Sequence, residues 1–62
     1  MTYKSVIVWW STGEKTEFRG NDIPDNIEMI GPFVCFQYYK TQKTISYYPA
    51  TIDKIETTQG DD

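Results

Sequence analysis

Apolar and polar residues alternate along several short segments of this chain, with the period of two that is typical of β-strands. Residues 3–10 carry apolar side chains on both alternating faces, which predicts a strand that is covered on two sides and lies at the centre of the sheet. Residues 14–19 hold charged side chains around one strongly apolar residue, Phe18, and we expect a half-exposed edge strand there. Two further strands are predicted over residues 33–40 and 44–48.

The longest predicted connection lies over residues 20–31, which are rich in turn-forming Gly, Asn, Asp and Pro. We expect Asp22 to cap a short helical turn in this segment and Gly31 to end it. Ile27 and Ile30 are three residues apart and would face the same side of such a turn.

Residues 49–51 interrupt the alternation near the C-terminal end of the sequence. Ile52 and Ile55 then recur at a three-residue step, which favours a short 3₁₀ turn before a last short strand. We therefore predict one β domain over residues 1–56, which ends with that strand, and a flexible acidic tail over residues 57–62.

The composition also favours an all-β fold. The chain has no leucine and one alanine, but seven isoleucines, three valines and eight threonines among its 62 residues. β-branched and aromatic side chains suit a pleated sheet, whereas a helical domain would draw on alanine and leucine. A chain of this length makes one domain with a single core.

The order of the predicted elements resembles a small SH3-like barrel, with a tight hairpin and a turn before the last strand. The segment Tyr48-Pro49-Ala50-Thr51-Ile52 is similar to the proline-led 3₁₀ turn that precedes the final strand of that fold. We therefore predict a five-stranded antiparallel SH3-like barrel or sandwich with one short helical turn. The acidic, tyrosine-rich first loop of peptide-binding members is missing, so the resemblance does not imply recognition of proline-rich peptides.

Three pairs of adjacent aromatic residues lie within the predicted strands: Trp9-Trp10, Tyr38-Tyr39 and Tyr47-Tyr48. Neighbouring side chains in a strand point to opposite faces, so each pair places a large ring on both faces of a sheet. Because the chain has one core, we expect the second aromatic face to meet another copy of the chain, a partner or a ligand. A homo-oligomer is therefore expected.

These second rings have two interpretations. In the first, they cover the rim of the core or an interface between protomers. In the second, they form a platform on which a base, a nucleotide or a sugar stacks. The groupings that would build such a platform are Trp9 with Tyr39, or Trp10 with Tyr38 and Tyr48.

The hairpin between the third and fourth predicted strands is basic, since it contains Lys40 and Lys43 beside Tyr38 and Tyr48. A solvated turn has this composition, and so does a site that contacts phosphate next to aromatic rings. Arg19 is the only arginine of the chain, and its guanidinium would add a forked donor to a phosphate or carboxylate.

The chain contains no histidine and one cysteine, Cys35. This excludes histidine-dependent nucleophilic chemistry, an intrachain disulfide and a Cys/His zinc site, and we expect a buried inert thiol, no cofactor and no enzymatic activity. The net charge is −3 and no basic stripe is present, so duplex DNA is not an expected partner. The apolar run over residues 6–10 is too short for a leader or a membrane span, and a cytosolic location is the default expectation.

A short, leucine-free, aromatic-rich chain with an acidic tail resembles the small accessory proteins that bacteriophages encode. That resemblance implies stoichiometric binding in the host cytosol rather than catalysis. We hypothesise an oligomeric protein that sequesters a small anionic ligand of nucleotide type and so counters a host defence signal. The side chains assigned to this ligand are Trp9, Trp10, Arg19, Tyr38, Tyr39, Lys40, Lys43, Tyr47 and Tyr48.

The alternative is a protein–protein inhibitor or adaptor that binds a host protein through an exposed aromatic patch or a free strand edge. Single-strand nucleic-acid binding and a purely structural role also stay open. The acidic balance of charge counts against the first of these two.

Overall fold

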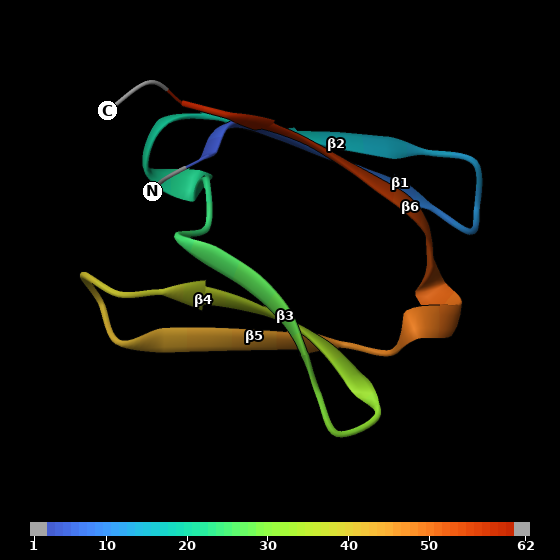
Figure 1. Ribbon diagram of the computed structural model, residues 1–62. Coiled ribbons are helices and arrows are strands. Elements are labelled where there is room, and N and C mark those ends of the chain that lie inside the picture. The colour runs from blue at the N-terminus through green and yellow to red at the C-terminus, as the bar shows by residue number, and fades with distance from the viewer. Residues whose placement is uncertain (1–2, 61–62) are drawn as a thin grey trace.

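The predicted all-β character is confirmed, since the strands assemble into two antiparallel sheets (Figure 1). The computed structural model describes residues 3–60. The first sheet has the order β2-β1-β6 and consists of β1 (Tyr3–Trp10), β2 (Lys15–Phe18) and β6 (Ile52–Gln59). The second has the order β3-β4-β5 and consists of β3 (Asn26–Ile30), β4 (Phe33–Tyr38) and β5 (Lys43–Tyr47). Two 3₁₀ turns link the sheets, η1 (Gly20–Asp22) and η2 (Pro49–Thr51).

The two sheets lie in separate layers, with the two turns connecting them at opposite ends (Figure 1). Within residues 3–60, no strand pairs with members of both sheets. Residues 3–60 therefore form six strands in two unclosed layers, where the sequence predicts five strands in a barrel or sandwich. The additional strand is β3, which arises inside the segment predicted as a connection.

The prediction of a helical turn that continues to Gly31 is wrong, because β3 occupies the second half of this segment and pairs with β4 along its whole length. The 3₁₀ turn is confined to η1, and Asp22 is its last residue rather than its cap. Ile27 and Ile30 lie on opposite faces of β3. Gly31 has a φ of +59° in the turn to β4, a conformation that glycine adopts without strain.

The last strand begins earlier and ends later than predicted. The 3₁₀ turn is η2, so Ile52 and Ile55 already belong to β6. Residues 57–59 pair with β1, and the predicted tail over residues 57–62 therefore starts too early. Threonine favours strands, and backbone hydrogen bonds to β1 extend the sheet where composition indicates a tail. The last two residues of that predicted tail lie outside the described residues.

β1 lies in the centre of its sheet, and β2 lies at the edge, as the two hydrophobic patterns predict. Val6 and Val8 on the inner face of β1 are fully buried. Ile7 and Trp9 on its outer face are half-buried. The two-sided pattern of β1 thus reflects one face that packs in the core and one face that neighbouring side chains partly cover.

The fully buried core cluster consists of Val6 and Val8 from β1 and Phe36 from β4. The centroid of the Phe36 ring lies 5.6 Å from that of Phe18 and 5.2 Å from that of Tyr47. These tilted and edge-on arrangements are favourable for aromatic pairs. Phe36 therefore joins the first sheet to the second and also supports the neighbouring strand β5.

Replacing Phe36 with alanine removes the ring that contacts both sheets. We expect the free energy of unfolding to fall by about 3–5 kcal/mol, which is as much as a core of this size supplies, so the variant is largely unfolded at room temperature. Phe33→Ala is the matched control, because Phe33 lies on the same strand but is half-buried against Tyr48. Urea unfolding followed by circular dichroism measures both variants, and equal losses would contradict this assignment of the core.

Candidate ligand-binding site

An open cavity of about 490 Å³ lies between η1 and the hairpin that joins β4 to β5. Ile23, Tyr38 and Ile45 line it with apolar and aromatic surface. Ile23 and Tyr38 also pack against the buried core cluster. The cavity is therefore the open end of the space between the two sheets.

Four charged side chains line the same cavity. Lys40 and Lys43 come from the β4–β5 hairpin, whereas Asp22 and Asp25 come from the connection that precedes β3. Within residues 3–60, every ion pair lies along β2 and its end, so neither lysine of the cavity is within ion-pair distance of a carboxylate. Positive and negative groups are thus both available to a ligand.

The conformation of the hairpin brings both lysines to the cavity. The N–H of Gln42 donates a 3.2 Å hydrogen bond to the carbonyl oxygen of Tyr39, and Gln42 has a φ of +55°, which is uncommon for a residue with a side chain. The N–H of Tyr39 donates to the carboxylate of Asp25 at 2.7 Å. This last bond ties the hairpin to the connection on the other side of the cavity.

Tyr38 bridges the two sides of the cavity. Its hydroxyl donates a 2.8 Å hydrogen bond to the backbone carbonyl oxygen of Asp22. Burial raises the pKa of Tyr38 above its ordinary value, and the nearby Tyr47, Asp22 and Asp25 raise this pKa further. Tyr38 is therefore neutral at physiological pH, and it offers an aromatic ring rather than a charge to a ligand.

Three of the predicted site residues meet at this cavity, namely Tyr38, Lys40 and Lys43. Tyr39 and Tyr48 do not line it. Both are largely exposed, at 63% and 67% of their surface. Tyr39 and Tyr48 directly follow the last residues of β4 and β5, whereas Tyr38 and Tyr47, which end these strands, pack against the buried core cluster.

Trp10 and Tyr47 belong to the packing around the core rather than to the cavity. Their ring centroids lie 5.3 Å apart, and both pack against the buried core cluster. The indole N–H of Trp10 donates a 2.8 Å hydrogen bond to the hydroxyl of Thr16. Within residues 3–60, the predicted groupings of rings into a stacking platform do not form, because packing between the two sheets places Trp10 against Tyr47 instead.

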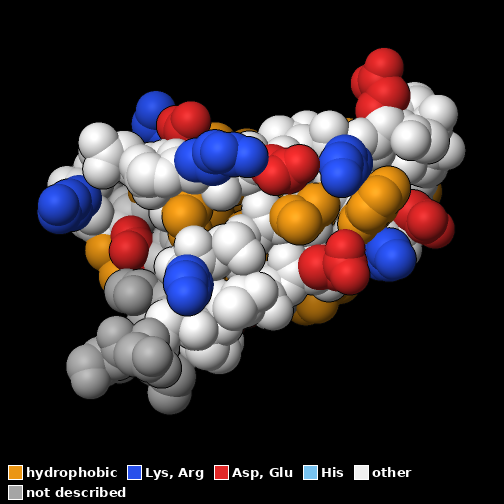
Figure 2. Space-filling model, turned by 90° about the horizontal axis from the view of Figure 1, so that it is seen from above, with side chains coloured by type: hydrophobic (Ala, Val, Ile, Leu, Met, Phe, Trp, Pro, Cys, Tyr) orange, Lys and Arg blue, Asp and Glu red, His pale blue; other side chains and the backbone are white. Residues whose placement is uncertain are grey.

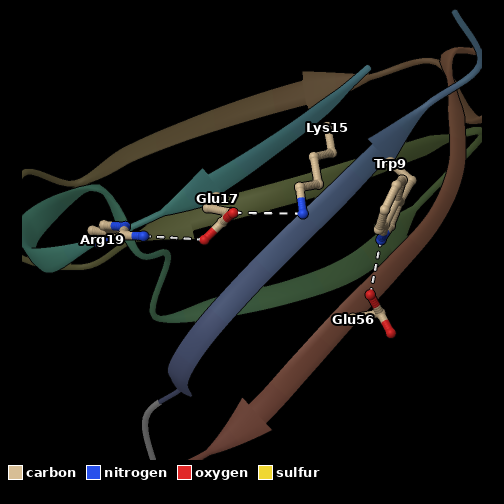
Figure 3. A network of polar contacts seen from close by, with 5 residues as sticks. All are labelled: Trp9, Lys15, Glu17, Arg19 and Glu56. Atoms are coloured by element: carbon tan, nitrogen blue, oxygen red, sulfur yellow. Dashed lines mark hydrogen bonds and ion pairs between the residues drawn. The ribbon is translucent and has the colours of Figure 1, made fainter. Parts of the chain in front are cut away.

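Trp9 lies on the outer face of the first sheet (Figure 3). The ammonium groups of Lys15 and Lys54 each lie 5.1 Å from the centroid of its ring. Its indole N–H donates a 2.8 Å hydrogen bond to the carboxylate of Glu56. Charged side chains of the two neighbouring strands, β2 and β6, therefore contact this ring through cation–π interactions and accept a hydrogen bond from its N–H.

Arg19 extends the same charged face beyond β2 (Figure 3). Its guanidinium lies 3.1 Å from the carboxylate of Glu17, which is 3.6 Å from the ammonium of Lys15. The Arg19 side chain is 82% exposed, so the pair contributes little to stability. Figure 2 shows acidic and basic side chains interspersed with apolar ones across this face. Arg19 does not line the cavity.

Sequence reasoning did not assign Asp22, Asp25, Ile23 or Ile45 to the site. Ile45 lies two residues after Lys43 on the same face of β5, so the alternation of that strand contained a signal. The other three precede β3 in the sequence. Only the pairing of β3 with β4 brings them beside the hairpin, and that pairing is not visible in the sequence.

Comparisons with known proteins identify no relative. The chain matches no protein family model, and no curated protein or solved structure matches it significantly. Within residues 3–60, no helix has the length and apolar character needed to cross a bilayer, and no three Cys, Asp or Glu side chains are grouped as metal ligands. The fold and the site together define a small two-sheet β domain with a cavity of mixed charge.

The raised pKa of Tyr38 makes stability depend on pH. Below about pH 10, the ordinary pKa of tyrosine, both the folded and the unfolded chain keep the proton, so the contribution of neutral Tyr38 is fully present. As the pH rises further, the unfolded chain loses the proton first, and stability is lost until the pH passes the folded-state pKa.

We therefore expect Tyr38→Phe to be less stable than the wild type by roughly 0.5–1.5 kcal/mol at neutral pH, because it lacks the hydroxyl hydrogen bond. This difference should shrink as the pH rises above about 10. Urea unfolding of both proteins at a series of pH values measures it. A difference that stays constant with pH would be inconsistent with the raised pKa.

Proposed function

We propose that this chain is a non-enzymatic binding domain that holds a small anionic ligand of nucleotide type in the cavity beside the β4–β5 hairpin. One observation carries the proposal: Lys40 and Lys43, without a carboxylate partner among residues 3–60, line an open cavity together with the ring of Tyr38. The volume of about 490 Å³ lies within the range of roughly 300–1,000 Å³ that is typical of ligand pockets.

The distribution of charge gives the ligand an orientation. Lysine ammonium groups donate to phosphate oxygens, so the phosphate lies toward the hairpin. Asp22 and Asp25 repel phosphate but accept hydrogen bonds from ring N–H groups or sugar hydroxyls, so the ring or the sugar lies toward η1. Tyr38, Ile23 and Ile45 supply the aromatic and apolar surface for a planar ring.

A protein with this site acts by sequestration, and no catalytic step is required. As a phage-type protein in the host cytosol, it lowers the free concentration of a nucleotide signal that serves host defence. The phage-type assignment is supported by the length and composition of the whole chain, which is short, leucine-free and aromatic-rich. The support for binding without catalysis is the lack of histidine, since the usual activated nucleophiles depend on it.

A relationship to the small SH3-like barrel is part of the same proposal. It is supported by η2, a proline-led 3₁₀ turn directly before the last strand, and by the antiparallel return of that strand beside β1. On this proposal, η1 divides one long strand into β2 and β3, which accounts for six strands in place of five.

Isothermal titration against a panel of nucleotides tests the ligand. We expect at least one member to bind, and we expect Lys40→Gln and Lys43→Gln each to weaken its binding by about tenfold or more, because each removes a charge-assisted hydrogen bond. Lys15→Gln is the matched control, because Lys15 lies over Trp9 on the outer face of the first sheet, and it should leave the affinity unchanged.

The result that would exclude this function is the absence of both heat and a thermal shift with every nucleotide of the panel. An equal loss of affinity in all three lysine variants would also contradict it. Such a loss would show that the total charge of the protein, rather than the cavity, determines binding.

A second candidate function is that of a protein–protein inhibitor or adaptor. It is favoured by apolar side chains on the second sheet, where Ile30 is 47% exposed and Phe33 lies 5.2 Å from Tyr48 between ring centroids. In this case Tyr48→Ala abolishes a stoichiometric complex with a host protein, while Lys43→Gln leaves it intact. The opposite pattern in a pull-down experiment would favour the cavity.

A further inference from the structure

The outer edge of β6 is an open strand edge. β6 lies at the end of the first sheet, and β1 is its only strand partner within residues 3–60. β6 runs for eight residues and contains neither glycine nor proline. An edge of this kind presents backbone donors and acceptors to which another strand can add.

The direction of the backbone groups in β6 follows from the pairing of β1. The N–H of Trp10 donates to the carbonyl oxygen of Glu14, which lies on the side of β2. Because successive residues of a strand direct their backbone groups to opposite sides, Trp9 and Ile7 direct theirs toward β6. The residues of β6 opposite these two therefore exchange hydrogen bonds with β1.

Those opposite residues are Lys54 and Glu56. Ile55 lies between Lys54 and Glu56, and Thr57 follows Glu56. Ile55 and Thr57 lie opposite Val8 and Val6 of β1, whose backbone groups point to β2. Ile55 and Thr57 therefore direct their N–H and C=O groups away from β1, to the open edge. The edge is thus equipped for antiparallel pairing at alternate residues.

The charged side chains beside this edge are complementary to a second copy of themselves. Lys54 and Glu56 both lie on the outer face, where they contact the ring and the indole N–H of Trp9. When two antiparallel copies of β6 pair about Ile55, each Lys54 lies directly opposite Glu56 of the second copy. A shift of two residues in one direction places Lys54 opposite Lys54, and a shift in the other places Glu56 opposite Glu56; both are unfavourable.

We propose that two copies of this chain associate through β6, antiparallel and with Ile55 on the twofold axis. The N–H and C=O of Ile55 then exchange hydrogen bonds with those of the second Ile55, and the two half-buried side chains meet on the inner face. Two Lys54–Glu56 pairs form on the outer face. The first sheets of both copies join into one sheet, and this interface does not use the cavity.

The regular part of β6 limits the extent of this interface. The pairing of β6 with β1 is irregular opposite Trp9–Trp10 and opposite Tyr3–Ser5, so the regular stretch lies between these two places. A strand pair of this length buries less than the roughly 1,200 Å² of a standard stable interface. We therefore expect a weak dimer, and the association stops at two copies because a twofold pairing uses the same edge of both.

Sedimentation velocity over about 10 µM to about 1 mM protein, a range suited to weak association, tests this interface. We expect the wild type to shift from monomer toward dimer. Lys54→Glu and Glu56→Lys each place like charges opposite one another twice, and we expect each to weaken dimerisation by about tenfold or more. An equimolar mixture of these two variants places opposite charges at both positions and restores association.

Lys15→Glu is the matched control. The ammonium groups of Lys15 and Lys54 lie at the same 5.1 Å from the Trp9 ring, but Lys15 lies on β2, at the opposite edge of the sheet from β6, so Lys15→Glu should dimerise like the wild type. Amide NMR spectra establish that each variant is folded. If a single variant is unfolded, the double variant Lys54→Glu/Glu56→Lys replaces it, because it keeps both charge pairs in exchanged positions and is expected to dimerise.

Three results would overturn the proposal. The first is a wild type that stays monomeric over the whole range. The second is a mixture, or a double variant, that fails to associate. The third is a loss of dimer in Lys15→Glu equal to that in Lys54→Glu, which would mean that the environment of Trp9 and not the β6 edge controls association. None of these results bears on nucleotide binding in the cavity.

Discussion

The packing of Phe36 between the two sheets is the interaction on which the rest of this small fold depends. A chain of 62 residues buries little apolar surface, and here the fully buried core cluster is Phe36 with Val6 and Val8. The cavity lies where this layer ends, because the inner face continues from Phe36 to Tyr38 along β4 and reaches Lys43 opposite Tyr38 on β5. The ring of Tyr38 and the ammonium group of Lys43 thus take the place of apolar core side chains at the open end of the two sheets.

The alternation of apolar and polar residues was sufficient to predict the all-β fold, the central position of β1 and the edge position of β2, because each depends on the pattern within one strand. The burial of Cys35 was predicted for the same reason. The existence of β3 was not, because Ile27 and Ile30 fit a helical spacing as well as a strand, and only the partner strand β4 decides between them. The end of β6 was misplaced because its last residues are held by pairing with β1 rather than by an apolar pattern.

The candidate site likewise contains residues that the sequence predicted and residues that it did not. Tyr38, Lys40 and Lys43 are close in sequence, so composition was enough to group them beside one hairpin. Asp22 and Asp25 reach the cavity only through the pairing of β3 with β4, which the sequence does not reveal. The Trp9-Trp10 doublet correctly predicts rings on both faces of β1, but the sequence does not show which of the two rings packs against the core. The contacts of Lys15, Lys54 and Glu56 with the outer ring of Trp9 depend on how β2 and β6 pair with β1.

Amide chemical shifts of the ¹⁵N-labelled protein, titrated with a panel of nucleotides, test most directly whether recognition takes place at the open end of the inner layer. We predict that one nucleotide perturbs the amides of Asp22, Tyr38, Lys40 and Lys43 and leaves that of Trp9 unchanged. Perturbations centred on Trp9 and its strand neighbours, or no perturbation with any nucleotide, would contradict this assignment.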